Sequence, residues 1–408
     1  CYAELTTAMP KCGGEHVFSY RAFGPIGSYI CTWSIILSYI GVVCYEAVSF
    51  PTILQYLFPS MSKIYLYSIC GFDVYLTWLL VAMAMAIIIL FINIKGTKKA
   101  AKFQKVLTGI IAATGIMLVV GAVYSGNVDN VRNQMFVGNS NLKIFENIIK
   151  VAIMTPFFFF GFDVIPQVAE EIKMPLKKLG KMMILSIIMA VTFYVFIVFA
   201  VGLVMDNKGI SKSMSETGLV TADAMARAFN STNMAKVLII GGLCGIVTSW
   251  NSFLIGGSRA LYSMANSYML PRKFGVLHKK HNTPVNALLL IGSLSVISPL
   301  FGRSMLIWIV DAGNFACCLA YCMVSLSFLI LRKKERSMKR PYKVRNYKIV
   351  GTFAVILSGS MAAMYIIPGT NCTMIWQEWI IVGGWTLLGL ILAYLSKKKY
   401  KKNFAQCH

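Results

Sequence analysis

The chain has 408 residues, of which 57% are hydrophobic and only 13% are charged. This composition excludes an ordinary soluble domain and is typical of a helical protein that crosses a membrane several times. The formal net charge is +24, from 39 Lys and Arg against 15 Asp and Glu. Most of the basic residues lie in alternate loops and at one tail, which is the positive-inside bias of a membrane protein and not a surface for nucleic acid.

Residues 1–9 have the pattern of the last turns of a helix whose start is absent, so we expect a fragment. A turn and an amphipathic piece follow and end at Pro25. Ten apolar spans are then predicted, at about 25–50, 74–94, 106–124, 146–169, 182–205, 235–258, 285–301, 306–331, 348–367 and 376–395. If the spans alternate across a cell membrane, every basic loop falls on one side together with residues 10–21 and the C-terminus. We therefore predict that this side is cytoplasmic.

The cysteines and histidines give no sign of a metal site. None of the 11 cysteines lies in a CxxC or Cys/His pattern, and most lie in apolar spans where a small side chain packs. Only Cys70 and Cys372 fall in loops expected outside, which leaves one external disulfide open. His16, like the other three histidines, is expected in a loop or tail, so a buried proton relay through histidine is not expected. We expect no cofactor, metal or catalytic residue.

The span at 146–169 carries the feature on which the functional prediction depends. Gly161 and Pro166 lie near its middle, and Pro166 would clash with the carbonyl of residue 162 in a continuous helix. In hydrocarbon a freed carbonyl is costly unless it lines a cavity or is buried in protein. We therefore predict a discontinuous helix whose carbonyls bind a ligand, as in secondary transporters. The alternative is a kink packed against its neighbours, with Asp163 capping the second half-helix.

The chemistry at this break favours a positively charged ligand. The C-terminal end of the first half-helix carries partial negative charge, which suits an ammonium group, and Asp163 adds a full charge. An aromatic ring of the run Phe157 to Phe160 could close over such a ligand with a cation–π contact. Packing against lipid or core is the ordinary alternative for these rings. Four successive residues point all around a helix, so at most one or two could contact the ligand.

Three acids lie well within the spans, namely Glu46, Asp163 and Asp311, and no Lys or Arg does. A charge at the bilayer centre costs roughly 2.5–3.5 kcal/mol on insertion scales, which makes each acid a functional candidate. An exclusively acidic set favours a cationic group or a proton as the species that passes. Glu46 could instead reach water at the outer end of its span. Asp311, in Asp311-Ala-Gly-Asn314, could instead cap a local irregularity.

Four ordered blocks resemble the amino acid–polyamine–organocation permeases, the APC superfamily. They are Tyr2-Ala-Glu-Leu with Pro10-Lys-Cys-Gly-Gly and Tyr20-Arg-Ala-Phe-Gly-Pro25; Phe160-Gly-Phe-Asp with Ala169-Glu-Glu and Pro175; Ser258-Arg-Ala-Leu-Tyr-Ser-Met-Ala265 with Leu270-Pro271 and Thr283-Pro-Val-Asn286; and Asp311-Ala-Gly with the run from Leu331 to Lys343. The resemblance implies an all-α polytopic membrane protein with a LeuT-type fold of two inverted five-helix repeats and two extra helices.

On this resemblance the chain is a single transporter domain that lacks the first family helix and most of the second. Residues 1–24 would be the end of helix two and an inner re-entrant turn. Residues 25–124 would be the rest of the first repeat, 146–331 the second repeat, and 348–395 the two extra helices.

The resemblance also implies roles for particular residues. Phe157 falls where relatives can place an aromatic gate, and the carbonyls of Phe157 and Phe160 fall where they take the substrate ammonium. Gly161 is the break itself, and Asp163 matches a common acidic position. Glu46 matches no family motif, which makes it a candidate for substrate choice. The predicted substrate-binding set is Phe157, Phe160, Gly161, Phe162, Asp163, Glu46 and Asp311.

Gating and ion coupling rest on two further sets of residues. Arg21, Glu170, Glu171 and Arg259 lie near the inner face, where we expect an ion-pair network that closes the inner gate; loose surface pairing is the alternative. Ser249 and Ser252 resemble the hydroxyls that sodium-coupled members of the fold use. A lysine that some proton-coupled relatives carry has no counterpart, since the nearest position is Ile111. Both H⁺ and Na⁺ therefore stay open as coupling ions.

We therefore expect a secondary active transporter of amino acids that works by alternating access in the lipid bilayer. A polyamine or simple amine transporter, or an antiporter, is the alternative that the excess of buried acid favours. An alternative of another class is a nutrient-sensing membrane receptor of the same fold. An enzyme is not expected, because the sequence has no His/Glu metal motif and no serine nucleophile elbow.

Overall fold

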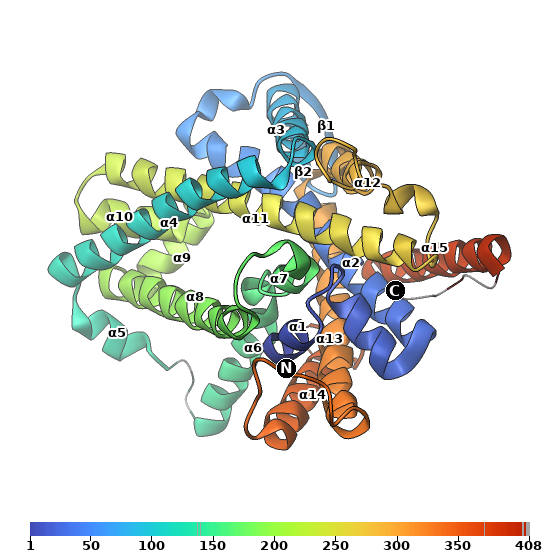
Figure 1. The fold of residues 1–408 in the computed structure, drawn as a ribbon. Coiled ribbons are helices and arrows are strands. Elements are labelled where there is room, and N and C mark those ends of the chain that lie inside the picture. Colours follow the sequence, from blue (N-terminus) through green and yellow to red (C-terminus); the bar gives the residue numbers. More distant parts are fainter. Residues whose placement is uncertain (137, 139, 371, 402–403, 405–408) are drawn as a thin grey trace.

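The computed structural model describes residues 1–136, 138, 140–370, 372–401 and 404, with the side chains of these residues other than 97–101, 153–157 and 305. Long helices form one bundle, and α2 packs most extensively against α13 and α11 near its centre (Figure 1). The helices are α1 (Tyr2–Ala8), α2 (Glu15–Leu57), α3 (Leu76–Ile94), α4 (Thr97–Ser125), α5 (Val128–Gln134), α6 (Asn141–Phe159), α7 (Val164–Gln167), α8 (Leu176–Val204), α9 (Asn207–Glu216), α10 (Val220–Ala228), α11 (Thr232–Asn266), α12 (Val285–Ile297), α13 (Gly302–Lys334), α14 (Tyr347–Met364) and α15 (Trp376–Tyr400).

Nine helices of the described part are long and apolar enough to cross a membrane: α2, α3, α4, α8, α11, α12 together with the short η4 (Ser298–Phe301), α13, α14 and α15. They correspond to nine of the ten predicted spans. The tenth, 146–169, is divided between α6 and α7, and the side chains of residues 153–157 in α6 lie outside the described part. The multi-span helical prediction is thus confirmed, and the broken span is the one that departs from a simple membrane helix.

The loop between α2 and α3 is an exception to the all-α prediction. Strands β1 (Tyr65–Ile69) and β2 (Phe72–Tyr75) pair there as an antiparallel hairpin. The connecting residues Cys70 and Gly71 both have positive φ, 49° and 78°, as a two-residue hairpin turn requires. The aromatic residues of these strands favour extended structure, which explains why a hairpin forms where the sequence analysis predicted a loop. Cys70 and Cys372 are both free thiols, so they do not form the external disulfide that the sequence left open.

The first long helix begins earlier than predicted, and this corrects the expectation for His16. Gly24 has non-helical angles (φ 79°, ψ −165°) directly before Pro25, so α2 consists of two helical pieces joined at a kink. The kink folds residues 15–23 back onto the protein, and His16 is fully buried and not in a loop. Its Nδ1 lies 2.8 Å from Oγ of Ser28, and its Nε2 lies 2.8 Å from Oγ of Ser267.

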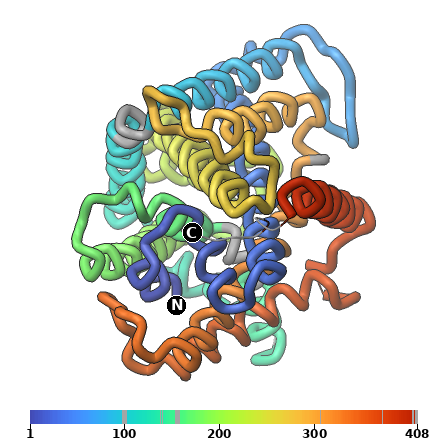
Figure 2. Tube along the Cα trace, turned by 45° about the vertical axis from the view of Figure 1, so that its right-hand side comes forward, coloured from blue at the N-terminus to red at the C-terminus, as the bar shows by residue number. Residues whose placement is uncertain are grey.

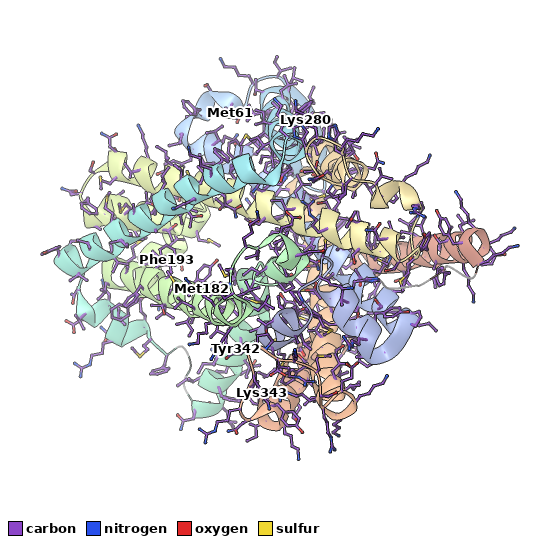
Figure 3. The ribbon with its side chains drawn as sticks, viewed as in Figure 1. Met61, Met182, Phe193, Lys280, Tyr342 and Lys343 are labelled. Carbon is purple, nitrogen blue, oxygen red and sulfur yellow. The ribbon has the colours of Figure 1, made fainter. Side chains whose placement is uncertain are left out.

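Two helices lie at the periphery of the bundle, and a close contact joins two others. The C-terminal helices α14 and α15 pack against α13 on the outside, where Figure 2 shows α15 as a separate rod along one side. On the other side of the molecule α8 approaches α4 closely. A Cβ added to Gly115 would lie 2.3 Å from Cζ of Phe193, which fills the space between these helices (Figure 3).

A turn between α1 and α2 touches the segment that follows the break. The N–H of Gly13 donates to the carbonyl of Gln167 at 3.4 Å. A Cβ on Gly14 would lie 2.6 Å from Cβ of Pro166 and 3.0 Å from its carbonyl carbon. Both glycines have positive φ, so the turn depends on them for backbone conformation as well as for space. This contact places the start of α2 against α7.

Candidate functional site

The predicted break is present at Phe160–Asp163. Helix α6 ends at Phe159, and the backbone of Phe160 is extended (φ −59°, ψ 149°). Gly161 follows with φ +118°, a conformation that glycine adopts and L side chains rarely do, and α7 begins at Val164. The carbonyls of the last turn of α6 therefore have no α-helical partner within their own helix. The break points this end of α6, with its partial negative charge, into the protein.

Asp163 lies in the break and is fully buried. Its Oδ1 accepts the N–H of Gly161 at 2.8 Å, so the side chain fixes the turn on its N-terminal side. The alternative role of capping α7 is not seen, because the side chain makes no cap hydrogen bond to that helix. Tyr39 of α2 and Tyr321 of α13 lie against the same carboxylate. Asp163 thus turns inward, toward α2 and α13.

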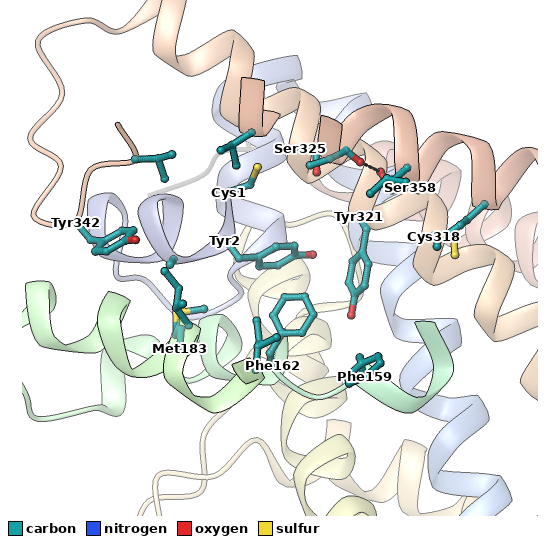
Figure 4. A pocket seen from close by; sticks show the side chains of 18 of the residues that line it. Cys1, Tyr2, Phe159, Phe162, Met183, Cys318, Tyr321, Ser325, Tyr342 and Ser358 are labelled. Atoms are coloured by element: carbon teal, nitrogen blue, oxygen red, sulfur yellow. Dashed lines mark hydrogen bonds between the residues drawn. The ribbon is translucent and has the colours of Figure 1, made fainter. Parts of the chain in front are cut away.

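Aromatic rings form a layer beside the break and border a cavity of about 750 Å³ (Figure 4). The ring of Phe162 packs edge-on to Tyr2, with centroids 5.1 Å apart, and lies 5.4 Å from Tyr321. The ring of Phe160 packs edge-on to Tyr321, with centroids 6.0 Å apart. The cavity lies between α1, α6, α8, α13 and α14, and its lining includes Tyr2, Phe159, Phe162, Met183, Tyr321 and Met361. The side chain of Phe157 is outside the described residues.

The other two acids that the sequence analysis placed within spans, Glu46 and Asp311, are half-buried and lie outside this group of rings. The carboxylate of Glu46 interacts with Ser249 of α11. Glu46 was predicted for the substrate site and Ser249 for an ion site, so this contact links the two predicted sets. Ser252 lies one helical turn further and is bonded elsewhere: it accepts from Nε2 of Gln104 at 2.6 Å. Asp311 interacts with Glu378 of α15. It precedes Tyr321 by ten residues on α13, which is about 15 Å along a helix.

The charged residues predicted for the inner gate form separate contacts. Nε of Arg259 lies 2.7 Å from Oε1 of Glu171, and this guanidinium is only 3% exposed. Arg21 pairs instead with Glu335, at 2.7 Å for both Nε–Oε1 and Nη2–Oε2. Glu170 accepts the backbone N–H of Cys12 at 3.1 Å. The four residues predicted for the inner gate therefore form three separate contacts. These are one half-buried ion pair, one exposed ion pair with Glu335 and one contact to a backbone N–H.

Two buried acids of the same region were missed by the sequence analysis. Glu4 is 1% exposed and lies between Arg332 and Arg340, with Oε2–Nη2 and Oε1–Nε distances of 2.6 and 3.1 Å. Glu15 is fully buried at the start of α2, and its Oε2 accepts from Nε2 of Gln167. A count of charges inside apolar spans could not find them, because both lie before the first predicted span at about 25–50.

Cys12 offers a test of the contact between Arg259 and Glu171. Burial raises the pKa of the Cys12 thiol to about 12, so at about pH 7.5 little reactive thiolate is present. We expect Glu171→Gln to release Arg259, expose the adjoining turn and speed maleimide labelling of Cys12 several-fold. Peptide mapping by mass spectrometry would follow Cys12 among the other thiols. Glu216→Gln, in an exposed pair with Lys212, is the matched control. Equal labelling of Cys12 in both variants would contradict the expectation.

Comparison with known sequences decides the family. The sequence model described as "Amino acid permease" matches residues 1–391, nearly the whole chain. The chain belongs to the amino acid permease family. The permease is 24% identical over 411 residues to the branched-chain amino acid permease BcaP of Bacillus subtilis, an alignment that covers 98% of this chain and 83% of the relative. The predicted APC membership is confirmed.

Two further relatives are similar to the chain at about the same level of sequence identity. The methylthioribose transporter of Bacillus subtilis is 23% identical over 408 residues, covering 98% of the permease and 82% of the relative. The Asc-type amino acid transporter 1 of Mus musculus is 25% identical over 354 residues, covering 84% of the permease and 62% of the relative. The permease is thus a multi-pass membrane protein of a transporter family and not an enzyme, as predicted. Its family implies a LeuT-type fold.

Proposed function

We propose that the permease is a secondary active transporter of amino acids that works by alternating access. The observation that carries the proposal is the end of α6 at Phe159, followed by Gly161 at φ +118° and a fully buried Asp163. A helix C-terminus and a carboxylate together suit the ammonium group of a substrate. The carbonyls at the end of α6 would take this ammonium, and the rings of Phe160 and Phe162 would close over the bound substrate.

The two sides of the break would then serve as gates. Tyr2 packs edge to face on Phe162 and on Tyr321, all three rings line the cavity, and Tyr321 also lies against Asp163, which suits a layer that opens and closes over a small ligand. The Arg259–Glu171 pair would hold α11 against the segment after α7 when the cytoplasmic side is closed. In the positive-inside arrangement this pair and the C-terminus face the cytoplasm. Rocking of the bundle that contains α6 would exchange the two closures.

A second substrate class is favoured by the buried acids. Asp163 and Glu15 are both fully buried, and a simple amine or polyamine lacks the carboxylate that would compete with them. The amine therefore stays the alternative substrate, and the same assay can test both.

The test is uptake by the full chain reconstituted in liposomes. Labelled leucine is supplied outside, and unlabelled alanine, arginine or putrescine is added as competitor. We expect saturable accumulation of leucine that alanine suppresses and that empty liposomes do not show. Suppression by putrescine with no effect of alanine would favour the amine transporter. Leucine binding to the purified protein with no accumulation would instead favour a receptor and contradict transport.

A further inference from the structure

Two fully buried carboxylates, Glu15 and Asp163, lie near enough to affect each other, and each has one hydrogen-bonded oxygen and one without a partner in the described chain. Oε2 of Glu15 accepts from Nε2 of Gln167, and Oδ1 of Asp163 accepts the N–H of Gly161. Within the described chain, the second oxygens of both acids are buried and have no hydrogen-bond partner. The two side chains are close enough to interact electrostatically, although 148 positions separate them in sequence. A shared site is formed by the start of α2 and the break before α7.

The surroundings of this pair supply polar groups but no positive charge. Tyr2 lies against Glu15, while Tyr39 and Tyr321 lie against Asp163, and in the part of the chain that is described their hydroxyls lack well-formed hydrogen bonds. Tyr39 is fully buried, so its hydroxyl has no access to water. The titratable side chains around the pair are Tyr2 of α1, Cys31 and Tyr39 of α2, and Cys317 and Tyr321 of α13.

The basic side chains of His16 and Arg259 have partners other than Glu15 and Asp163. His16, the neighbour of Glu15 in sequence, directs its ring nitrogens to Ser28 and Ser267. Arg259 pairs with Glu171. Among the ion pairs of the described residues, none includes Glu15 or Asp163. Two interacting carboxylates buried without a cation cannot both remain ionised at low cost, as the shared proton of a carboxylate dyad illustrates.

We propose that Glu15 and Asp163 together hold the coupling proton of this permease. The inference rests on the proposed transport function and deepens it by naming the ion and its site. One carboxylate takes a proton from solution, and the charge of the pair changes from −2 to −1. The remaining charge is then available to a substrate ammonium near Asp163. No covalent step is involved, and the same proton leaves as H⁺ on the other side.

The turn between α1 and α2 gives this site a route for release. Glu15 directly follows Gly13 and Gly14, which contact Gln167 and Pro166 after the break. Movement of α7 relative to this turn therefore changes the separation of the two carboxylates. Separated carboxylates repel each other less and no longer share a proton, so the proton is lost when the pair opens. Binding and release of the proton are thereby tied to the same motion as that of the substrate.

The test measures protons and substrate together in liposomes that contain the full chain. Labelled leucine uptake is followed beside an internal pH dye, and a pH gradient or a Na⁺ gradient is imposed in separate arms. In the wild type we expect acidification of the lumen during uptake and accumulation with the pH gradient alone. Glu15→Gln should lower the ratio of protons to leucine by about tenfold and flatten the pH dependence of uptake, and Asp163→Asn should do the same. Glu15→Asp, which keeps a titratable group, should restore much of the ratio.

The controls separate this site from transport itself. Glu216→Gln, an exposed acid on α9, should keep the wild-type ratio. If Glu15→Gln fails to give monodisperse protein, Glu15→Leu, which needs no polar partner in this buried position, carries the same comparison. An unchanged ratio in whichever variant folds, or accumulation driven by Na⁺ with no proton movement in the wild type, would overturn the coupling site while transport stands. Absence of leucine and putrescine uptake in the wild type would instead overturn the proposed function.

Discussion

Replacement of Gly161 by alanine is expected to lower leucine uptake at least about tenfold, because the break requires φ +118° at this residue. An L side chain held at such an angle costs about 1–3 kcal/mol, so alanine would favour other backbone conformations between α6 and α7. The effect is one of backbone strain and not of a clash. A Cβ at this position would lie 3.8 Å from Cζ of Phe253, which is an ordinary contact distance.

The uptake assay described above measures this effect, with Gly383→Ala as the matched control. Gly383 lies on the exposed side of α15, where a Cβ would meet no atom within 4 Å. That variant should transport as the wild type does, since alanine in a helix costs less than glycine. Wild-type uptake by Gly161→Ala would show that transport does not depend on the left-handed turn.

The substitution Glu4→Ala is expected to cause the largest loss of stability. It removes the only carboxylate that the structure places between Arg332 and Arg340 within the described residues, and both arginine side chains are less than a tenth exposed. The N–H of Val344 also loses its acceptor, Oε2 of Glu4 at 2.7 Å. Breaking a buried ion pair from one side costs about 3–5 kcal/mol, because the other charge stays buried without compensation.

Thermal unfolding of the detergent-solubilised protein, followed by size-exclusion chromatography, would measure this loss. Glu216→Ala provides the comparison, since its pair with Lys212 is exposed on both sides and 3.8 Å long. An exposed pair of this kind contributes about 0–1 kcal/mol. Similar midpoints for the two variants would mean that water or a rearranged side chain compensates the arginines.

The parts of the site that follow from local chemistry could be predicted from the sequence. Gly161 and Pro166 disfavour a continuous helix wherever the span lies, and the structure has its break there. The burial of Asp163 follows equally from its position in an apolar run. Each of these properties depends on residues within a few positions of one another, so no knowledge of the tertiary fold is needed.

The partners of charged side chains could not be predicted in the same way. Arg21 was expected near Glu170 but pairs with Glu335, which is 314 positions away. Glu15 and His16 lie in a polar stretch and become buried only because the kink at Gly24 folds that stretch onto the bundle. Such burial is a property of the assembled helices, and a pattern of hydrophobicity along one segment carries no information about it.

The contacts of the short turn at residues 12–14 would limit the rate of a conformational change between α11 and the segment after the break. The turn is tied to α11, since Ser263 Oγ donates to the carbonyl of Cys12 at 3.2 Å, and to the segment after the break through Gly13 and Gln167. A single three-residue turn thus holds together two elements that separate in the proposed transport cycle. Larger residues at Gly13 or Gly14 would not fit in this turn. Its contacts with α11 and with the segment after the break would then be broken for a larger fraction of the time, in a chain that is otherwise folded.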